Sequence, residues 1–292
     1  MQLSITAPAT LSGQNLLSRR EAEPAGAAGA AAEALRPDAA DGACSFQVDW
    51  ARSATEIGEA QRLRFRVFSG EMGAELQAGG ESSAKRDVDA FDAFFDHLLV
   101  RATTGAQQGE VIATCRVMSP DGAQRAGGFY TDTEFDLAAL SDRLPLALEM
   151  GRVCIDPAWR NGLVVMGLWR ELGRRMSELR LDTLIGCASV SLNDGGAAAV
   201  GLWQLLKHTH LVAPMWRVRP RKPFDLRFAG AQSAAQVPMQ VPALIKAYLR
   251  CGGKLLGPPA LDTAFNTADF PMWMHLSDLP SRYGKRIFGA CA

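Results

Sequence analysis

The stretch Glu149–Leu172, which reads EMGRVCIDPAWRNGLVVMGLWREL, decides the fold of this chain. Short apolar runs surround Glu149 and Arg152 and predict a buried or half-buried strand over residues 147–155. A buried charge is costly unless it is paired or functional. Both side chains are therefore candidates for the chemistry.

A polar turn and a helix follow this strand. The turn is Arg160-Asn161-Gly162, in which glycine permits a positive φ and a close approach of a ligand to the backbone. Apolar residues then recur at helical spacing as far as Leu179. Free N–H groups at the start of such a helix can hold a phosphate. The alternative is a strand, turn and helix with only a solvated arginine-rich face.

Composition limits the class of protein. The chain has 292 residues and balances 31 basic against 31 acidic residues, so we expect no nucleic-acid partner. Its six cysteines form no CxxC pair, which favours a reducing, cytoplasmic setting. No run approaches the roughly 20 apolar residues of a membrane span. His208 and His210 lack a carboxylate or cysteine at ligand spacing, so no metal site is predicted.

The chain divides near residue 45. Residues 1–44 are rich in Ala, Gly, Glu, Asp and Pro without a sustained period, which predicts a disordered or weakly helical leader. Residues 45–292 are predicted to form one α+β domain, a mixed central sheet flanked by helices, which residues 231–292 complete. The polar segment 69–95 is expected to be a functional or mobile loop.

Periodicity predicts the individual elements. The predicted strands cover residues 46–50, 97–102, 111–118, 147–155, 183–189, 211–218 and 270–276. The predicted helices cover residues 54–68, a short connection within 131–144, the segment from the turn to 179, residues 197–208 and an amphipathic segment at 241–250.

Three further groups of charged residues belong with Glu149 and Arg152 in one interpretation. They are the arginines at the end of helix 54–68, the aspartates at 87–92, and Arg116 inside an apolar strand. The apolar residues around them predict that all three groups are partly buried. Paired charges of this kind are typical of a site that recognises a small zwitterion or amino acid. A structural ion-pair network is an equally good interpretation.

The remaining signal is a set of short motifs. In chain order they are RLRFRVF (62–68), DVDAFD (87–92), TCRVM (114–118), LEMGRVCIDPAWRNG (148–162), LW (168–169), GCAS (186–189), VPALIKAYLR (241–250) and FNTADF (265–270). Together they resemble the ornithine N-acyltransferases that begin ornithine-lipid synthesis, which belong to the Gcn5-related N-acetyltransferase superfamily. The first four are also similar to acyl-homoserine-lactone synthases. The resemblance implies a Gcn5-related N-acetyltransferase-like fold.

The resemblance also implies site residues. The implied catalytic residues are Glu149 and Arg152. Glu149 is the base that deprotonates an amine directly or through water, and Arg152 orients Glu149 or pairs with it. The implied substrate-binding residues are Arg64, Phe68, Asp89, Asp92 and Arg116. Among these, the aspartates hold the cationic side of ornithine and an arginine holds its carboxylate. Backbone N–H groups near residues 153–155 stabilise the oxyanion.

Two departures from the related families narrow the function. Ala74 stands where the lactone synthases usually have tryptophan, which argues against a lactone synthase. The turn at Arg160, Asn161 and Gly162 has one displaced glycine, which fits the single phosphodiester of a 4'-phosphopantetheine arm better than coenzyme A.

The basic residues offer docking surfaces. The helix face formed by Arg170, Arg174 and Arg175 and the run 217–227 are either landing sites for an acidic acyl carrier protein or plain solvated surface.

The expected activity is transfer of a (3-hydroxy)fatty acyl group from acyl carrier protein to the α-amine of ornithine, giving lyso-ornithine lipid without a resident cofactor. One alternative is an acyl-homoserine-lactone synthase that uses S-adenosylmethionine, and another is a non-catalytic module that binds acyl groups or carrier protein. A lipid-like product also predicts peripheral contact with the inner membrane face through residues 241–250, unless their apolar side chains belong to the core.

Overall fold

The computed structural model describes residues 45–70, 85–227, 241–281 and 283–284, which belong to one compact unit. The predicted leader and Ala74 lie outside the described residues. None of the helices in these ranges is both long and apolar enough to cross a membrane.

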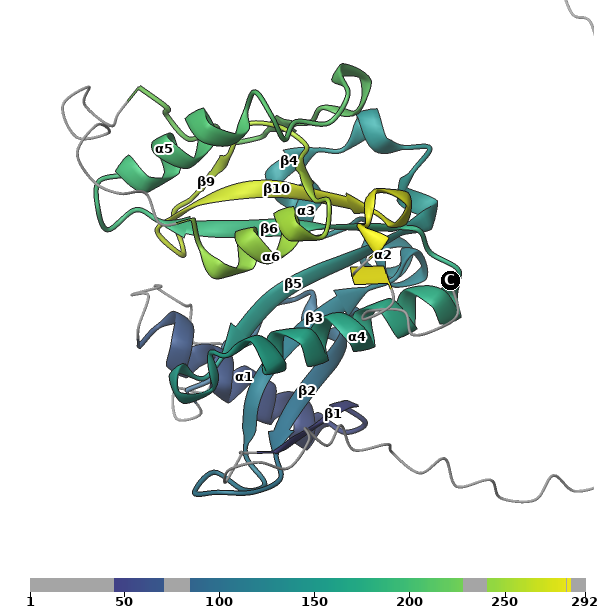
Figure 1. The fold of residues 1–292 in the computed structure, drawn as a ribbon, viewed down its shortest axis with the longest axis vertical. Coiled ribbons are helices and arrows are strands. Elements are labelled where there is room, and N and C mark those ends of the chain that lie inside the picture. The colour runs from purple at the N-terminus through teal and green to yellow at the C-terminus, as the bar shows by residue number, and fades with distance from the viewer. Residues whose placement is uncertain (1–44, 71–84, 228–240, 282, 285–292) are drawn as a thin grey trace, which may run out of the picture. The chain divides into compact units, whose positions relative to one another are not determined.

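A mixed sheet of eight strands runs through the described chain (Figure 1). Its order is β1-β2-β3-β5-β6-β10-β8, and β9 also pairs with β10. Only the β5–β6 pair is parallel. The strands are β1 (Phe46–Trp50), β2 (Asp96–Ala102), β3 (Val111–Met118), β5 (Ala147–Ile155), β6 (Thr183–Ser191), β8 (Lys254–Leu255), β9 (Ala260–Asp262) and β10 (Thr267–His275). The predicted mixed sheet is confirmed.

The sheet opens in its middle. Strands β5 and β6 pair only over Ala147–Glu149 and Thr183–Ile185, after which they diverge, as Figure 1 shows. The β3–β5 register also shifts next to this point, and Arg152 has a φ of 51°, which marks a bulge in β5. The opening leaves the edge of β5 beyond Glu149 without a β6 partner.

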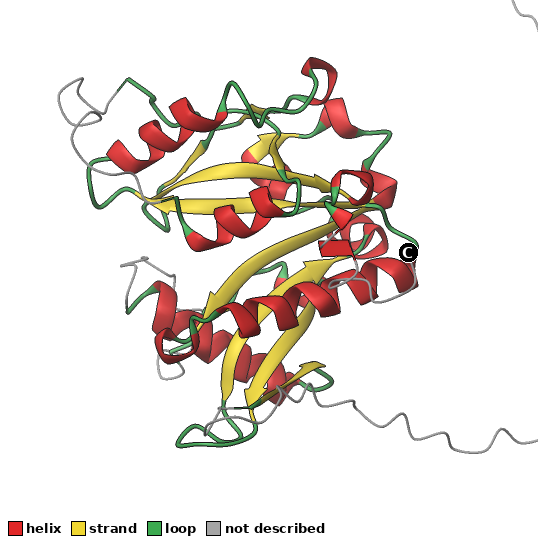
Figure 2. Cartoon of the chain, viewed as in Figure 1, coloured by secondary structure: helices red, strands yellow, loops and turns green. Residues whose placement is uncertain are grey.

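Helices cover both faces of the sheet (Figure 2). They are α1 (Ala54–Phe68), α2 (Pro120–Ala126), α3 (Thr131–Glu134), α4 (Gly162–Leu179), α5 (Ala197–Leu206) and α6 (Ala243–Arg250). Because neighbouring strand residues point to opposite faces, Leu98 of β2 packs in the α4 core and Leu99 packs against Leu63 of α1. The sheet is thus buried on both sides.

Local sequence explains where α1 begins. Ser53 accepts a hydrogen bond from the backbone N–H of Glu56, and the Glu56 carboxylate accepts one from the N–H of Arg52 at 2.7 Å. This reciprocal capping satisfies N–H groups that a helix start leaves free. The cap sets the phase of the helix, so that Arg64 lies on its buried side and Phe68 ends it.

One predicted strand was wrong, and one predicted helical connection was right only in part. Residues 211–218 form no strand: Leu211 makes one isolated bridge to Leu255, and Pro214–Trp216 is a 3-10 turn, because proline lacks an N–H and fixes φ. The connection at 131–144 is helical only in pieces. It contains α3, the short strand β4 (Phe135–Asp136), which pairs with β7 (Arg219–Pro220), and a 3-10 turn.

The amphipathic segment at 241–250 forms α6, and its apolar side belongs to the core. Ile245 and Tyr248 are buried, and the Tyr248 ring packs edge-on against Trp169 of α4 at 5.3 Å. These two residues are therefore not available to a membrane surface, and the alternative interpretation holds for them.

Candidate active site

A cavity of about 220 Å³ lies where β5 and β6 separate. One wall is formed by residues 149–153 of β5. The other walls combine residues from many elements, namely Phe68, Phe95, Arg116, Tyr130, Glu134, Cys187, Ser189, Leu244, Asp262, Phe265, Thr267 and Asp269. The cavity therefore unites the motifs at 148–162, 186–189 and 265–270, as well as the strand arginine, in one site.

Glu149 is held firmly in the cavity wall. Its side chain is 1% exposed, and its carboxylate accepts bonds from the N–H groups of Tyr130 at 2.7 Å and Thr131 at 2.6 Å and from the Thr131 hydroxyl. Burial raises the pKa of Glu149 above its ordinary value, against the opposing effect of these hydrogen bonds. Among the described residues, only Tyr130 donates a hydrogen bond to Oε2, so this oxygen keeps a lone pair for a proton.

The predicted arginines and aspartates form a closed ring of alternating charges. The ring runs through Arg64, Asp87, Arg152, Asp89, Arg116 and Asp92, and each neighbouring pair is joined by an ion pair of 2.6–3.3 Å. Three positive and three negative groups make it neutral overall. Mutual pairing offsets the cost of removing these charges from water.

The charged residues predicted for the site differ in whether they line the cavity. Arg116 and Arg152 line the cavity, whereas Arg64, Asp89 and Asp92 do not. Arg64 is 1% exposed and donates to Asp87 and Asp92. The structure thus brings Arg64 and the two aspartates into the ring with Arg116 and Arg152 but does not place them among the residues that line the cavity.

The two cavity arginines are also clamped by aromatic rings. The Arg116 guanidinium lies 4.3 Å from the Phe95 ring centre, and that of Arg152 lies 4.5 Å from the Phe265 ring centre. Phe265 in turn packs edge-on against Phe68 at the end of α1. The aromatic contacts and the ion pairs of the ring together fix the two guanidinium groups before a ligand arrives.

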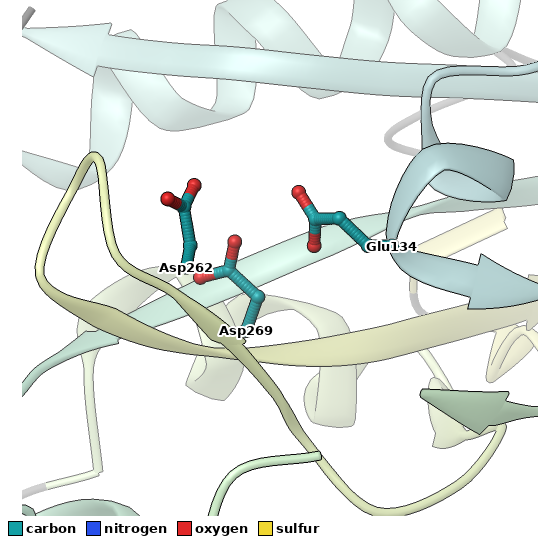
Figure 3. Close-up of side chains that lie close together, drawn as sticks. All are labelled: Glu134, Asp262 and Asp269. Carbon is teal, nitrogen blue, oxygen red and sulfur yellow. The ribbon is translucent and has the colours of Figure 1, made fainter. Parts of the chain in front are cut away.

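A carboxylate cluster that the sequence analysis missed lies on the other side of the cavity. Carboxyl oxygens of Glu134, Asp262 and Asp269 lie within 4.8 Å of one another, and Figure 3 shows them turned toward a common point. Burial, followed by the charges of Asp269 and Asp262, raises the pKa of Glu134 to about 9. Burial also raises the pKa of Asp269. An aspartate inside the apolar motif FNTADF was the available signal.

Cys187 shares this cavity without acting as a thiolate. Burial, with the nearby carboxylates, raises its pKa well above the ordinary value. Its sulfur lies 3.8 Å from the Thr131 hydroxyl. This environment agrees with a mechanism that uses no cysteine nucleophile.

Helix α4 begins at the turn 160–162 as predicted, but the feature that starts it is a side-chain cap and not the conformation of the glycine. The Asn161 side chain accepts bonds from the N–H groups of Leu163 and Val164, both at 3.1 Å. Gly162 does not adopt the expected positive φ, because it is already the first helical residue. Arg160 donates to the Ile155 carbonyl at 3.1 Å. Open space beside the Gly162 Cα still permits a close approach.

The predicted basic face of α4 is largely neutralised. Arg174 pairs with Glu171 and Glu178, and Arg175 pairs with Asp96. Arg170 is exposed and forms no ion pair with another described residue. Of the three arginines predicted to face a carrier protein, Arg170 is thus the one without an ion pair to a described residue.

Comparison with known proteins places this site in a family. Residues 63–170 match the model of the acetyltransferase (GNAT) domain, which confirms the predicted fold class. Among solved structures, the acyl-homoserine-lactone synthase LasI is 13% identical with a TM-score of 0.46, covering 85% of this chain and 95% of its own. FeeM, an N-acyl amino acid synthase from uncultured soil microbes, is 11% identical with a TM-score of 0.48, covering 80% and 92%.

Sequence relatives are much closer. L-ornithine N(alpha)-acyltransferase of Rhizobium meliloti is 34% identical over 80% of this chain and 81% of its own length. The enzyme of the same name from Rhodobacter capsulatus is 33% identical over 84% and 97%. On this identity and coverage, together with the matching domain, the chain belongs to the L-ornithine N(alpha)-acyltransferase family.

Proposed function

We propose that the chain transfers a fatty acyl group from an acyl-carrier-protein thioester to the α-amine of ornithine, giving lyso-ornithine lipid. The observation that carries this proposal is a single cavity that presents two arginines, a buried glutamate and a separate carboxylate cluster. Such a cavity suits an amino acid that carries one carboxylate and two amines. The names of the relatives support ornithine as the acceptor.

Glu149 is the proposed base. The α-ammonium of ornithine loses a proton to Glu149, directly or through water, because only the neutral amine has a lone pair for attack. A C–N bond then forms at the thioester carbonyl and the C–S bond breaks. The nitrogen loses its second proton to become the amide, and the departing thiolate takes up that proton to leave as the free thiol. The raised pKa of Glu149 brings its proton affinity closer to that of the amine.

Arg116 and Arg152 orient the acceptor in this scheme. The Nε atom of Arg116 is buried and has no hydrogen-bond partner among the described residues, so it can donate to the ornithine carboxylate. Pairing within the charge ring holds both guanidinium groups in place. The ring contributes to orientation and does not itself react.

The donor arm fits the opening between β5 and β6. Beyond Glu149, residues 150–153 line the cavity and are not paired with β6, so backbone N–H groups here can hold the arm and stabilise the oxyanion. At the start of α4 the N–H groups of Leu163 and Val164 bond Asn161, so the N–H of Gly162 is the group offered to the phosphodiester. Exposed Arg170 is a docking contact for an acidic carrier protein.

Release of free thiol from acyl-carrier thioester tests this proposal. Purified protein is incubated with the thioester plus ornithine, plus S-adenosylmethionine, or with neither. Ornithine-dependent release is required. Release that depends on S-adenosylmethionine would identify a lactone synthase instead, and no acceptor-dependent release would favour a non-catalytic binding module.

A further inference from the structure

We infer that Glu134, Asp262 and Asp269 form the pocket for the side-chain ammonium of the acceptor, and thereby make the site specific for an amino acid with a second amine. The inference rests on the proposed function for the identity of the acceptor. It moves recognition of the cation away from Asp89 and Asp92, which the charge ring already occupies.

The cluster lacks a positive partner of its own. Each arginine of the charge ring pairs with Asp87, Asp89 or Asp92, and no described residue forms an ion pair with Glu134, Asp262 or Asp269. Three carboxyl groups this close repel one another when charged. An ammonium group, with three donors, would relieve that repulsion and satisfy several oxygens at once.

Unpartnered atoms in the cavity wall provide independent evidence for a ligand. The Oε2 atom of Glu134 is buried and accepts no hydrogen bond from a described residue. Arg116 is 1% exposed, lines the same cavity, and keeps a buried Nε–H without a partner. Buried polar atoms are rarely left unpaired. The Nε–H of Arg152, which also lines the cavity, has no hydrogen-bond partner among the described residues either. One oxygen and two N–H groups therefore remain for a molecule that carries both a cation and an anion.

Helix α3 links the proposed base to the carboxylate cluster. Its first N–H groups bond Glu149, and its last residue is Glu134. Both glutamates line the same cavity. An amino acid whose two amines are separated by a short chain can thus place its α-amine near Glu149 and its side-chain ammonium near Glu134.

A divalent cation is the competing occupant. Carboxylate oxygens also bind Mg²⁺ and Ca²⁺. The ammonium is favoured because the cluster shares one cavity with two arginines, and an amino acid uses both sides of that cavity.

Calorimetric titration with L-ornithine and L-norvaline tests the inference without relying on turnover. Norvaline has the same carbon chain but no side-chain amine. We expect the full-length protein to bind ornithine at least about 100-fold more tightly than norvaline. Glu134→Gln and Asp262→Asn should remove most of this preference by weakening ornithine binding, and leave norvaline binding unchanged. Asp262→Asn keeps the acceptor oxygen that bonds the N–H groups of Ala264 and Phe265.

Asp136→Asn is the matched control, since Asp136 is exposed and lies two residues beyond Glu134. It should bind both ligands like the unmodified protein. Equal binding of ornithine and norvaline, or equal weakening of both by Glu134→Gln, would overturn the inference. So would an ornithine preference that disappears with EDTA and returns with Mg²⁺ or Ca²⁺. Tight, selective ornithine binding without acyl transfer would instead contradict only the proposed function.

Discussion

Arg116 donates from Nη1 to Oδ1 of Asp92 across 2.6 Å, and both side chains are buried. This contact joins the central sheet to the segment that follows α1, and it closes the ring of alternating charges. The ring explains why so many charges occur in apolar surroundings: most of them satisfy one another, and only Arg116 and Arg152 also face the cavity.

Asp92→Asn should destabilise the fold severely. The change leaves Arg64 and Arg116 buried with one carboxylate fewer, a loss of roughly 3–5 kcal/mol for a broken buried pair. Urea denaturation followed by tryptophan fluorescence measures it. Asp225→Asn is the control, because Asp225 and its partner Arg227 are exposed, and its denaturation midpoint should stay unchanged. Equal midpoints for both variants would contradict a structural role for the ring.

Lowering the pH should reveal the same dependence of fold stability on Asp92. Burial alone would raise the pKa of Asp92, yet the hydrogen bonds and charges of Arg64 and Arg116 hold it well below its usual range. Stability from this group is therefore present above the ordinary carboxylate pKa and is lost as the pH falls.

The hydrogen bond from the Thr131 hydroxyl to Glu149 should affect the pH dependence of the reaction. Glu149→Gln should abolish turnover while the protein stays folded, because the amide cannot accept the proton. Thr131→Val removes a hydroxyl that lowers the pKa of Glu149, so the rising limb of the kcat–pH profile should move to higher pH. A limb that stays in place would mean that Glu149 does not titrate in catalysis.

Glu134 should make stability depend on pH between the ordinary glutamate pKa and about 9. Its pKa is raised to about 9 in the folded protein, so the folded state holds a proton that the unfolded state releases. The resulting stability is complete below the ordinary glutamate pKa and is lost as the pH rises toward 9. Glu134→Gln should flatten this decline in urea denaturation measured across the range. An equally steep decline in the variant would be inconsistent with a proton held at Glu134.

Asn161 allows a test of the start of α4. Asn161→Asp preserves the cap on the N–H groups of Leu163 and Val164, so thermal stability should stay close to that of the unmodified protein. Its negative charge should repel a phosphodiester, and KM for the carrier thioester should rise while KM for ornithine does not. Asn161→Ala should instead cost about 1 kcal/mol of stability. An unchanged KM for the thioester with Asn161→Asp would remove this turn from the donor site.

Local patterns in the sequence predicted the central elements well. The alternation around Glu149 and the helical spacing after Gly162 predicted β5 and α4, because each pattern reflects burial of one element against its neighbours. The predicted strand at 211–218 failed since its apolar residues pack without a ladder partner once Pro214 interrupts the chain. Helix α2 was not among the predicted helices. It begins after the cap formed by Ser119, and its short sequence shows little hydrophobic periodicity.

Long-range pairing was beyond sequence reasoning. The charged residues of the site could be recognised individually, but their partners could not: Asp87 completes the ring without having been singled out. In the carboxylate cluster, Glu134 lies next to Asp262 and Asp269 although it is far from both of them in the sequence. Only the folding of β10 next to β6 brings them to one cavity.

The most direct test of the account is the position of the new amide bond. Ornithine labelled with ¹⁵N at the α-amine is incubated with the protein and acyl-carrier thioester, and the product is fragmented in a mass spectrometer. With the side-chain ammonium held by the carboxylate cluster and the α-amine near Glu149, the acyl group should be on the labelled nitrogen. An acyl group on the unlabelled nitrogen, or no acylated ornithine at all, would contradict the account.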